Sequence, residues 1–460
     1  MDPRGSIVIV GAGVAGLTLA YKLLEGGCPR SVVIVEKLDR VGGLARSFTY
    51  GGFTFDIGPH RFHSDDKAVM DFVLEVLGTD FIEIDRSSAV WMYGEYHEWP
   101  LTPRTIRKLP FSLMFKSSLD LLRRRTARNE SFEDFVIERY GRTLYKVFFK
   151  PYTEKFLKYS CAELHADWAR TGINRSVIDR RVKTDTLLDV ARSALLPQRV
   201  ETTFIYPRSG GNDVFCRYLE QRVRALGGRI ELSNTVARAK MRDGRVTRVT
   251  LGSGAQLDTD FLFWTGPIPA LTTLLGLEDT LPRVEYLAMV LANYMIDAPL
   301  GMPYQWCYFG TEESPVSRVS SPTLFNPSLA PEGRSGLCVE LSCMEGDGVW
   351  THPERMRPIV EQFLVLTKMI QRHNDIIDVR FERVSDAYPI YTLDYPARLN
   401  QIVGRLREFH NVLNFGRTGG FWYNNQDHSI GLAMGIARAY LRGPAAFDPN
   451  RFKFQRDYTQ

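Results

Sequence analysis

A glycine-rich turn near the start of the chain has the residue types that bind a dinucleotide. Gly11, Gly13 and Gly16 form a Gly-x-Gly-x-x-Gly motif, and Glu36 follows 20 residues after its last glycine. The first glycine permits a tight turn, the second leaves room for a pyrophosphate, and the third allows close packing of helix and strand. A carboxylate at the position of Glu36 can accept both hydrogen bonds of a ribose diol. We therefore favour a dinucleotide site over a purely structural turn.

The residues around this motif predict the elements that position it. Ile7 to Val10 is a short apolar run typical of a buried parallel strand, and Leu17 to Leu24 continues from the glycines as a helix. A second apolar run, Val32 to Val35, ends directly before Glu36. The N-terminus of such a helix offers free N–H groups to phosphates. The order of strand, glycine turn, helix and strand indicates a dinucleotide-binding domain.

The composition excludes several other classes of protein. The chain has 460 residues, of which 44% are hydrophobic and 24% charged, as in a soluble globular protein with a large core. Its net charge of +5 is too weak for a dedicated nucleic-acid binder. The six cysteines are scattered without metal-ligand spacing, so we expect no metal site and a reducing, cytoplasmic compartment. No apolar run reaches the roughly 18 residues of a transmembrane segment.

Two segments after the glycine turn resemble the amine-oxidase-like flavoproteins. Residues 40–46 resemble their second glycine motif, and residues 55–60 resemble their flavin-side turn. The resemblance implies FAD as the cofactor. It implies contacts with the pyrophosphate from Gly42, Gly43 and Arg46, and with the flavin from Gly58, Pro59 and His60.

Later segments are similar to the parts of these flavoproteins that return to the cofactor. Residues 206–211, the helical run 214–226 and the strand 230–232 look like the region that backs the adenine. Residues 412–415 read as a strand, and Asp427 begins a helix whose N-terminus in this superfamily points at the flavin. These segments add Val236, Gly416, Arg417, Asp427 and Ser429 to the expected cofactor contacts.

We expect an α/β fold with a Rossmann-like FAD-binding domain assembled from separated segments and an inserted mixed α+β substrate domain. The FAD-binding domain would comprise residues 1–61, 199–283 and 400–445. The substrate-binding domain would comprise residues 62–198 and 284–399, and residues 446–460 would form a C-terminal tail.

Within this superfamily, the chain resembles UDP-galactopyranose mutase. The similar segments are residues 58–64, 99–106, 152–155, 315–319 and 388–390, and the correspondence runs from residue 7 to about residue 440. The resemblance implies that Arg318 and Tyr388 bind a diphosphate and act in catalysis together with His60. It adds Tyr152, Lys155 and Arg175 as further substrate contacts.

The implied reaction is the isomerisation of a nucleotide sugar. N5 of reduced FAD attacks the anomeric carbon, the nucleotide diphosphate leaves, and the sugar ring opens and recloses without net redox. A reductant such as NAD(P)H would keep the flavin active. His60 would hydrogen-bond near N5 when neutral, or stabilise reduced flavin when charged. The alternative is an FAD-dependent oxidoreductase that oxidises a small molecule, with the aromatic-rich stretch 306–309 lining its pocket.

Two further segments carry structural predictions. Ser64 is expected to cap a helix whose apolar residues include Val69, Phe72 and Val76, and Gly78 is expected to end it. Residues 103–125 interleave basic and apolar side chains. Such a segment either lies on anionic lipid or forms a core-facing helix with a solvated charged face.

Overall fold

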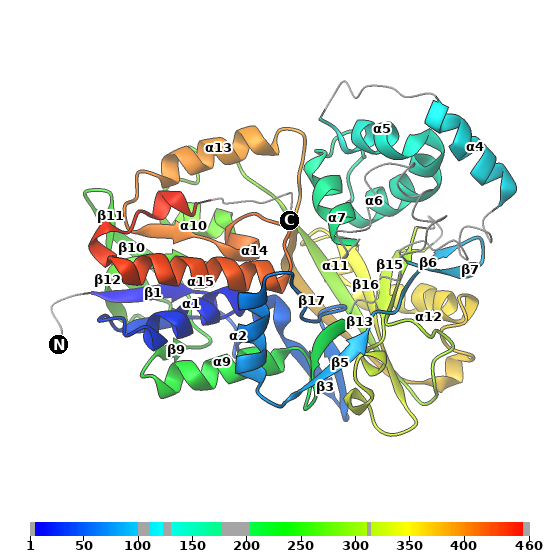
Figure 1. Cartoon of the computed structure of the whole chain (residues 1–460), viewed down its shortest axis with the longest axis horizontal. Helices are drawn as coiled ribbons and strands as arrows, with labels where there is room; N and C mark the ends of the chain where they lie inside the picture. Colours follow the sequence, from blue (N-terminus) through cyan, green and yellow to red (C-terminus); the bar gives the residue numbers. More distant parts are fainter. Residues whose placement is uncertain (1–4, 100–109, 123–129, 177–202, 311–313, 454–460) are drawn as a thin grey trace.

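The computed structural model describes residues 5–99, 110–122, 130–176, 203–310 and 314–453, and its fold is mixed α/β (Figure 1). Two seven-stranded sheets lie side by side, one toward the N-terminus in the figure and the other toward helix α12. There are also two small two-stranded sheets, β3–β4 and β5–β8.

The first sheet has the strand order β10-β11-β12-β1-β2-β9, and β18 pairs with β12. Neighbouring strands around β1 are parallel, whereas β10, β11 and the start of β12 form an antiparallel meander. The strands are β1 (Ser6–Val10), β2 (Val32–Val35), β9 (Arg229–Glu231), β10 (Val236–Arg242), β11 (Arg245–Leu251), β12 (Gln256–Trp264) and β18 (Val412–Asn414). They come from three separated stretches of the chain.

The centre of this sheet is buried on both faces, which explains its continuous apolar runs. Ile7 and Ile9 pack in a core shared with helices α1 (Val14–Glu25), α9 (Asp213–Ala225) and α15 (Gln426–Arg442). Val8 points to the other face, where it shares a core with residues of β11 and α10 (Ile268–Leu274). The alternation fixes the register of β1 and therefore the position of the turn that follows it.

Helix α2 (Lys67–Leu77) buries the predicted apolar face and ends at Gly78, whose φ is +61°. The prediction of Ser64 as its cap is wrong. Asp66 is the cap, and its Oδ1 accepts from the N–H of Ala68 at 2.9 Å. Ser64 instead accepts from the N–H of Asp66, which makes the turn before the helix.

The second sheet has the order β17-β13-β16-β15-β14-β6-β7. Its pairs are antiparallel except for β14 and β6, which are parallel. The strands are β6 (Ser88–Met92), β7 (Glu95–Glu98), β13 (Tyr286–Ile296), β14 (Trp306–Phe309), β15 (Val316–Ser320), β16 (Ser335–Cys343) and β17 (Ile376–Pro389). Every residue of β16 is buried, so this strand lies in the core of the sheet.

The small sheets and remaining helices surround these two layers (Figure 1). The small sheets are β3 (Ser47–Tyr50) with β4 (Phe53–Asp56), and β5 (Phe81–Asp85) with β8 (Thr203–Pro207). One helical group contains α4 (Phe111–Leu122), α5 (Phe132–Leu144), α6 (Lys150–Leu157) and α7 (Asp167–Ser176). The other helices are α11 (Gly348–Thr351), α12 (Arg357–Leu366), α13 (Tyr395–Leu406) and α14 (Gly416–Gly419).

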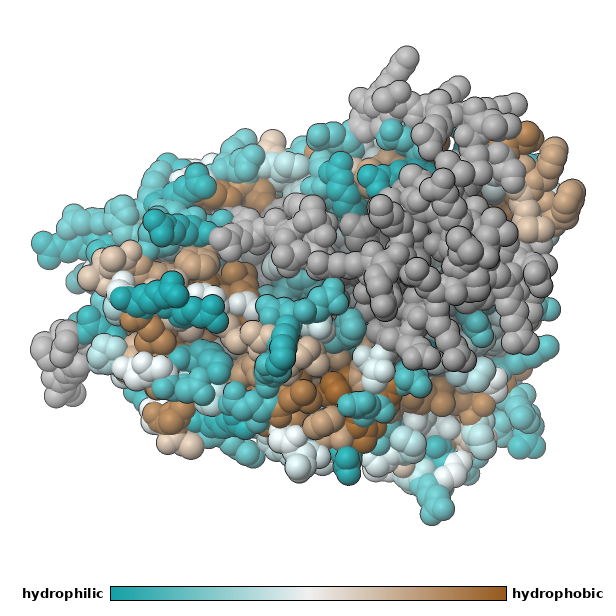
Figure 2. Space-filling model, viewed as in Figure 1, coloured by the Kyte–Doolittle hydropathy of each residue, from teal (hydrophilic) through white to brown (hydrophobic). Residues whose placement is uncertain are grey.

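Helix α4 is the described part of the basic, apolar segment 103–125. Leu113 is buried, whereas Phe111, Phe115 and Leu119 are exposed at helical spacing. Figure 2 shows the apolar surface at the edge where α4 lies in Figure 1. This part of the segment therefore does not bury all of its apolar positions. Among the residues that the structure describes, no helix is both long and apolar enough to span a membrane.

Candidate active site

The turn between β1 and α1 has the shape that a pyrophosphate requires. Gly11 has a φ of +101°, and a Cβ on Gly16 would lie only 2.0 Å from the carbonyl oxygen of Gly11, so both positions require glycine. A Cβ on Gly13 would meet nothing in the chain closer than Gly43 Cα at 3.8 Å. Helix α1 has no side-chain cap and no acidic residue in its first turn. The N-terminus of α1 can therefore receive an anion beside Gly13.

Glu36 is held in a fixed orientation at the end of β2. Its Oε2 accepts from the N–H of Ala12 at 2.7 Å, and its Oε1 accepts from the N–H of Leu38 at 3.0 Å. Each oxygen keeps a further lone pair for a ribose hydroxyl. Val236 begins β10 nearby, since the backbone N–H of Asn234 donates to the carbonyl of Glu36 at 2.9 Å.

The second glycine motif lies against the first. The N–H of Gly42 donates to the carbonyl of Ala12 at 2.8 Å, and Gly42 and Gly43 both have positive φ values. Arg46 donates to the carbonyl of Gly43 at 2.7 Å, and its guanidinium lies 5.3 Å from the ring centre of Phe48. Burial lowers the pKa of Arg46, which marks a cation held partly away from water.

The C-terminal segment reaches the same turn. A Cβ on Gly416 would lie 3.1 Å from Cβ of Ala15, so this turn packs on the start of α1. Asp427 lies in the first turn of α15 and contacts His428 at 3.0 Å. Ser429 is buried and exchanges hydrogen bonds with Asn424. The uncapped glycine turn, the oriented carboxylate of Glu36 and the cation Arg46 together fit the pyrophosphate and ribose of FAD.

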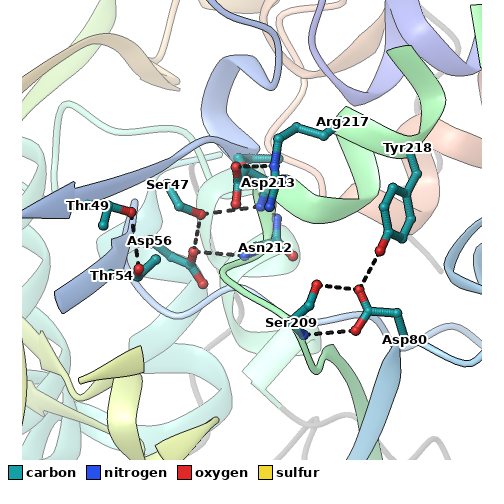
Figure 3. A network of polar contacts seen from close by, with 11 residues as sticks. Ser47, Thr49, Thr54, Asp56, Asp80, Ser209, Asn212, Asp213, Arg217 and Tyr218 are labelled. Carbon is teal, nitrogen blue, oxygen red and sulfur yellow. Dashed lines mark hydrogen bonds and ion pairs between the residues drawn. The ribbon is translucent and has the colours of Figure 1, made fainter. Parts of the chain in front are cut away.

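Asp56 joins β4 to the segment after β8 (Figure 3). Its carboxylate accepts from Ser47 Oγ at 2.6 Å, from Tyr206 Oη at 2.6 Å and from the N–H of Asn212 at 2.9 Å. Ser47 in turn accepts from the N–H of Asp213 at 3.3 Å. The network anchors the flavin-side turn at Asp56, two residues before Gly58.

The flavin-side turn approaches the second sheet at Gly58. This residue has a φ of +69°, and a Cβ there would lie 2.5 Å from Glu340 Oε1 and 3.1 Å from Arg318 Nη2. Only glycine allows this approach. Next along the turn, His60 Nδ1 lies 3.4 Å from the carbonyl of Gly58. Burial, followed by nearby cations that include Arg318, lowers the pKa of His60 to about 3, so its imidazole is neutral.

Arg318 forms a bidentate ion pair with a fully buried carboxylate. Its Nε and Nη2 donate to Glu340 Oε1 at 2.6 Å and Oε2 at 2.8 Å. Nη2 also lies 3.3 Å from Tyr388 Oη. Although burial opposes its charge, Glu340 raises the pKa of Arg318. Burial raises the pKa of Tyr388 to about 12, so its hydroxyl stays protonated at neutral pH.

Aromatic side chains surround this polar cluster. Tyr388 packs edge-on against Phe156 and Tyr423, and the guanidinium of Arg417 lies 4.6 Å from the ring centre of Tyr388. Tyr152 stacks on Phe156 and meets Tyr308 edge-on. The structure therefore brings Tyr152, Tyr388 and Arg417 into one cluster with Arg318.

The two other expected substrate contacts lie on helices beside the sheet. Lys155, on α6, donates to the carbonyl of Val316 at 2.7 Å, two residues before Arg318. Burial lowers the pKa of Lys155 to about 7. Arg175 belongs to the last turn of α7, and its side chain lies outside the described residues.

Three charged residues in or beside the cluster were not identified from the sequence. Glu340 reads as part of an apolar strand, and its partner is known only once β15 and β16 pair. Arg61 directly follows the flavin-side turn, and Arg86 precedes β6. Arg61 could have been recognised in the sequence, because it is a charged residue within the mutase-like segment 58–64.

Comparison with known proteins gives the family. The family model described as flavin containing amine oxidoreductase matches residues 14–291, which is more than half of the chain. The chain belongs to this flavin-containing amine oxidoreductase family. It is an FAD-dependent enzyme, of the isomerase or the oxidoreductase kind.

Individual relatives of this flavoprotein fall into both kinds. Coproporphyrinogen III oxidase of Mycobacterium tuberculosis is 32% identical over 114 residues, which cover 24% of this chain and 25% of the relative. A probable UDP-galactopyranose mutase of Klebsiella pneumoniae is 26% identical over 171 residues, 35% of this chain and 43% of the relative. These matches therefore span less than half of either relative.

The likeness in fold extends over the whole flavoprotein. A crystal structure of reduced UDP-galactopyranose mutase superposes with a TM-score of 0.81 at 21% sequence identity, covering 98% of this chain and 99% of that one. The resemblance to the mutase noted in the sequence is thereby confirmed for the fold.

Proposed function

We propose that this flavoprotein isomerises a nucleotide-activated sugar by ring contraction. The observation that supports it is the approach of the flavin-side turn at Gly58 to the Arg318–Glu340 pair and Tyr388. The fold likeness to a reduced mutase agrees with this reading. We further propose that residues 1–61, 199–283 and 400–445 bind FAD, and that residues 62–198 and 284–399 bind the substrate.

In this proposal, bound reduced FAD supplies a nucleophilic N5 for the anomeric carbon. Arg318 and Tyr388 donate hydrogen bonds to the oxygens of the departing diphosphate. Glu340 fixes the guanidinium of Arg318 in place but also cancels its charge. Neutral His60 offers one donor and one acceptor and adds no charge beside the flavin.

The alternative is an FAD-dependent oxidoreductase acting on a small molecule. It is supported by the aromatic wall around Tyr388 and by the match to coproporphyrinogen III oxidase. Pockets lined by aromatic side chains suit an organic substrate with a large apolar surface. The two functions differ in the oxidation state of flavin that reacts, so one experiment separates them.

The test compares the reduced and oxidised FAD-loaded enzyme under anaerobic conditions. UDP-galactopyranose and UDP-galactofuranose are supplied separately, and chromatography measures their interconversion. We expect interconversion with dithionite-reduced or NAD(P)H-reduced enzyme only. If reduced enzyme converts neither sugar while coproporphyrinogen III bleaches the oxidised flavin, the alternative function replaces this one.

A paired substitution tests the role of Arg318. Changing Arg318 alone would leave Glu340 buried without a partner, so Arg318→Gln is combined with Glu340→Gln. We expect UDP binding to weaken about 10- to 100-fold with FAD content unchanged. The matched control removes the exposed Arg334–Asp297 pair by Arg334→Gln with Asp297→Asn. Equal UDP affinity in the two double variants would show that Arg318 does not contribute to UDP binding.

A further inference from the structure

Two arginines beside the Arg318 cluster have an unusual environment. The guanidinium of Arg61 lies 4.9 Å from the ring centre of Phe204 and 5.1 Å from that of Trp306. The guanidinium of Arg86 lies 5.6 Å from the ring centre of Trp306, and its Nε donates to Ser88 Oγ at 3.2 Å. Across the described ranges, neither arginine forms an ion pair with a carboxylate. Both lie partly buried on aromatic faces.

The strand order brings these arginines close to Arg318. In β14, Trp306 pairs with Ser88 of β6, and Tyr308 pairs with Arg318 of β15. Arg86 precedes β6, so Arg86 and Arg318 approach β14 from its two neighbouring strands. Arg61 reaches the same strand from the flavin-side turn. Three cations from distant parts of the chain therefore meet around one short strand.

The three arginines differ in whether a carboxylate neutralises their charge. Glu340 neutralises Arg318 within a bidentate pair. Burial lowers the pKa of Arg61, and Asp427, the carboxylate whose charge opposes this shift, makes no ion pair with Arg61 in the described structure. Nη1 of Arg86 is buried and makes no hydrogen bond in the described structure. Burial lowers the pKa of Arg86 to about 10, so it still carries its charge at neutral pH. The two unpaired charges are costly to bury in the absence of an anion.

We propose that Arg61 and Arg86 bind an anionic oxygen group of the substrate, in addition to the group held by Arg318. Guanidinium groups present planar pairs of N–H donors that match carboxylate or phosphate oxygens. The rings of Phe204 and Trp306 hold these planes in place without competing for their hydrogen bonds. The anion is either a phosphate of the nucleotide or a carboxylate on the sugar. The choice between phosphate and carboxylate rests on the proposed function, whereas the binding of an anion by Arg61 and Arg86 does not.

The first test measures anion binding to the FAD-loaded enzyme by calorimetry, with sodium pyrophosphate and malonate as probes. We expect Arg61→Gln and Arg86→Gln each to weaken both probes about tenfold or more, with FAD content unchanged. Arg242→Gln, at an exposed position on β10, is the control. Without anion, Arg86→Gln is expected to raise the thermal midpoint because it removes an unpaired charge. A purely structural arginine would instead lower it.

Further variants and ligands complete the test. Arg86→Lys keeps the charge but loses the planar pair of N–H donors, so we also expect weaker pyrophosphate binding in this variant. For UDP, UDP-galactose and UDP-glucuronic acid, equal losses in the variants assign the anion to the diphosphate. A loss confined to UDP-glucuronic acid assigns it to a carboxylate. Wild-type affinities in both glutamine variants, or loss of FAD from them, would overturn the proposal. Arginine-dependent pyrophosphate binding without sugar isomerisation would retain it and reject the proposed function.

Discussion

The ionisation of Asp56 gives a quantitative test of how the flavin-side turn is anchored. Burial raises its pKa to about 6, although Ser47 and Tyr206 donate to its charged form. In the unfolded chain the pKa is about 3.9. Because the folded value is higher, the stability that this group contributes is complete below pH about 4 and is lost as the pH rises through 6. A shift of about two units corresponds to about 3 kcal/mol.

Asp56→Asn removes this titration while keeping an oxygen that can accept from Ser47 and from the N–H of Asn212. We expect the free energy of unfolding of the variant, minus that of the wild type, to rise by about 2 kcal/mol between pH 4 and pH 7, because the unfolded chain is already half ionised at pH 4. Urea unfolding of the FAD-loaded enzyme with excess FAD measures this difference.

Asp80 is the matched control because it lies in the same region and carries similar contacts (Figure 3). It accepts from the N–H and Oγ of Ser209 and from Tyr218 Oη. Burial alone would raise its pKa, but these donors, Ser209 foremost, lower it. For Asp80→Asn, the free energy of unfolding of the variant minus that of the wild type should therefore fall as the pH rises. A flat or falling difference for Asp56→Asn would refute the reasoning.

Three other predictions concern the cofactor turn and the charged cluster. Gly13→Ala should lower the flavin absorbance per chain without unfolding it, whereas Gly16→Ala should lower the thermal midpoint, because its Cβ would clash at 2.0 Å; equal effects would contradict this. Glu340→Gln leaves Arg318 buried without its partner, so urea unfolding should show a loss of about 3–5 kcal/mol, and unchanged stability would argue against the ion pair. Burial lowers the pKa of Lys155 to about 7, so UDP binding should weaken as the pH rises through 7. In Lys155→Met, the UDP affinity should no longer fall as the pH rises through 7. If it falls as in the wild type, Lys155 does not contribute to UDP binding.

Local patterns in the sequence predicted the parts of the fold that depend on neighbouring residues. The strand, turn and helix around Gly11 lie within 20 residues, so their glycine spacing and apolar runs are sufficient. The cap of α2 shows the limit of this approach. Ser64, Asp65 and Asp66 are all good capping residues, and only the backbone geometry selects Asp66.

The charged cluster depends on contacts between distant segments, which periodicity does not encode. Arg318 was singled out by resemblance, but its partner Glu340 lies 22 residues away on the next strand. Arg61 and Arg86 are 25 positions apart, and only the pairing of β6 with β14 brings Arg86 to Trp306. The partial burial of a charge without an ion-pair partner is a property of the folded chain, so a sequence pattern alone did not reveal it.

The order of strands in the first sheet also determines how long β1 waits for its neighbour β12 while the chain is synthesised. Ile7 pairs with Phe261, so β1 lacks that neighbour until 254 further residues have been made. At about 5–20 residues per second, this takes about 13 to 50 seconds. During that time β1 can pair with β2 on one side, but its other edge has no neighbouring strand. A chain truncated at residue 250 should therefore not bind FAD, although it contains every residue of both glycine motifs.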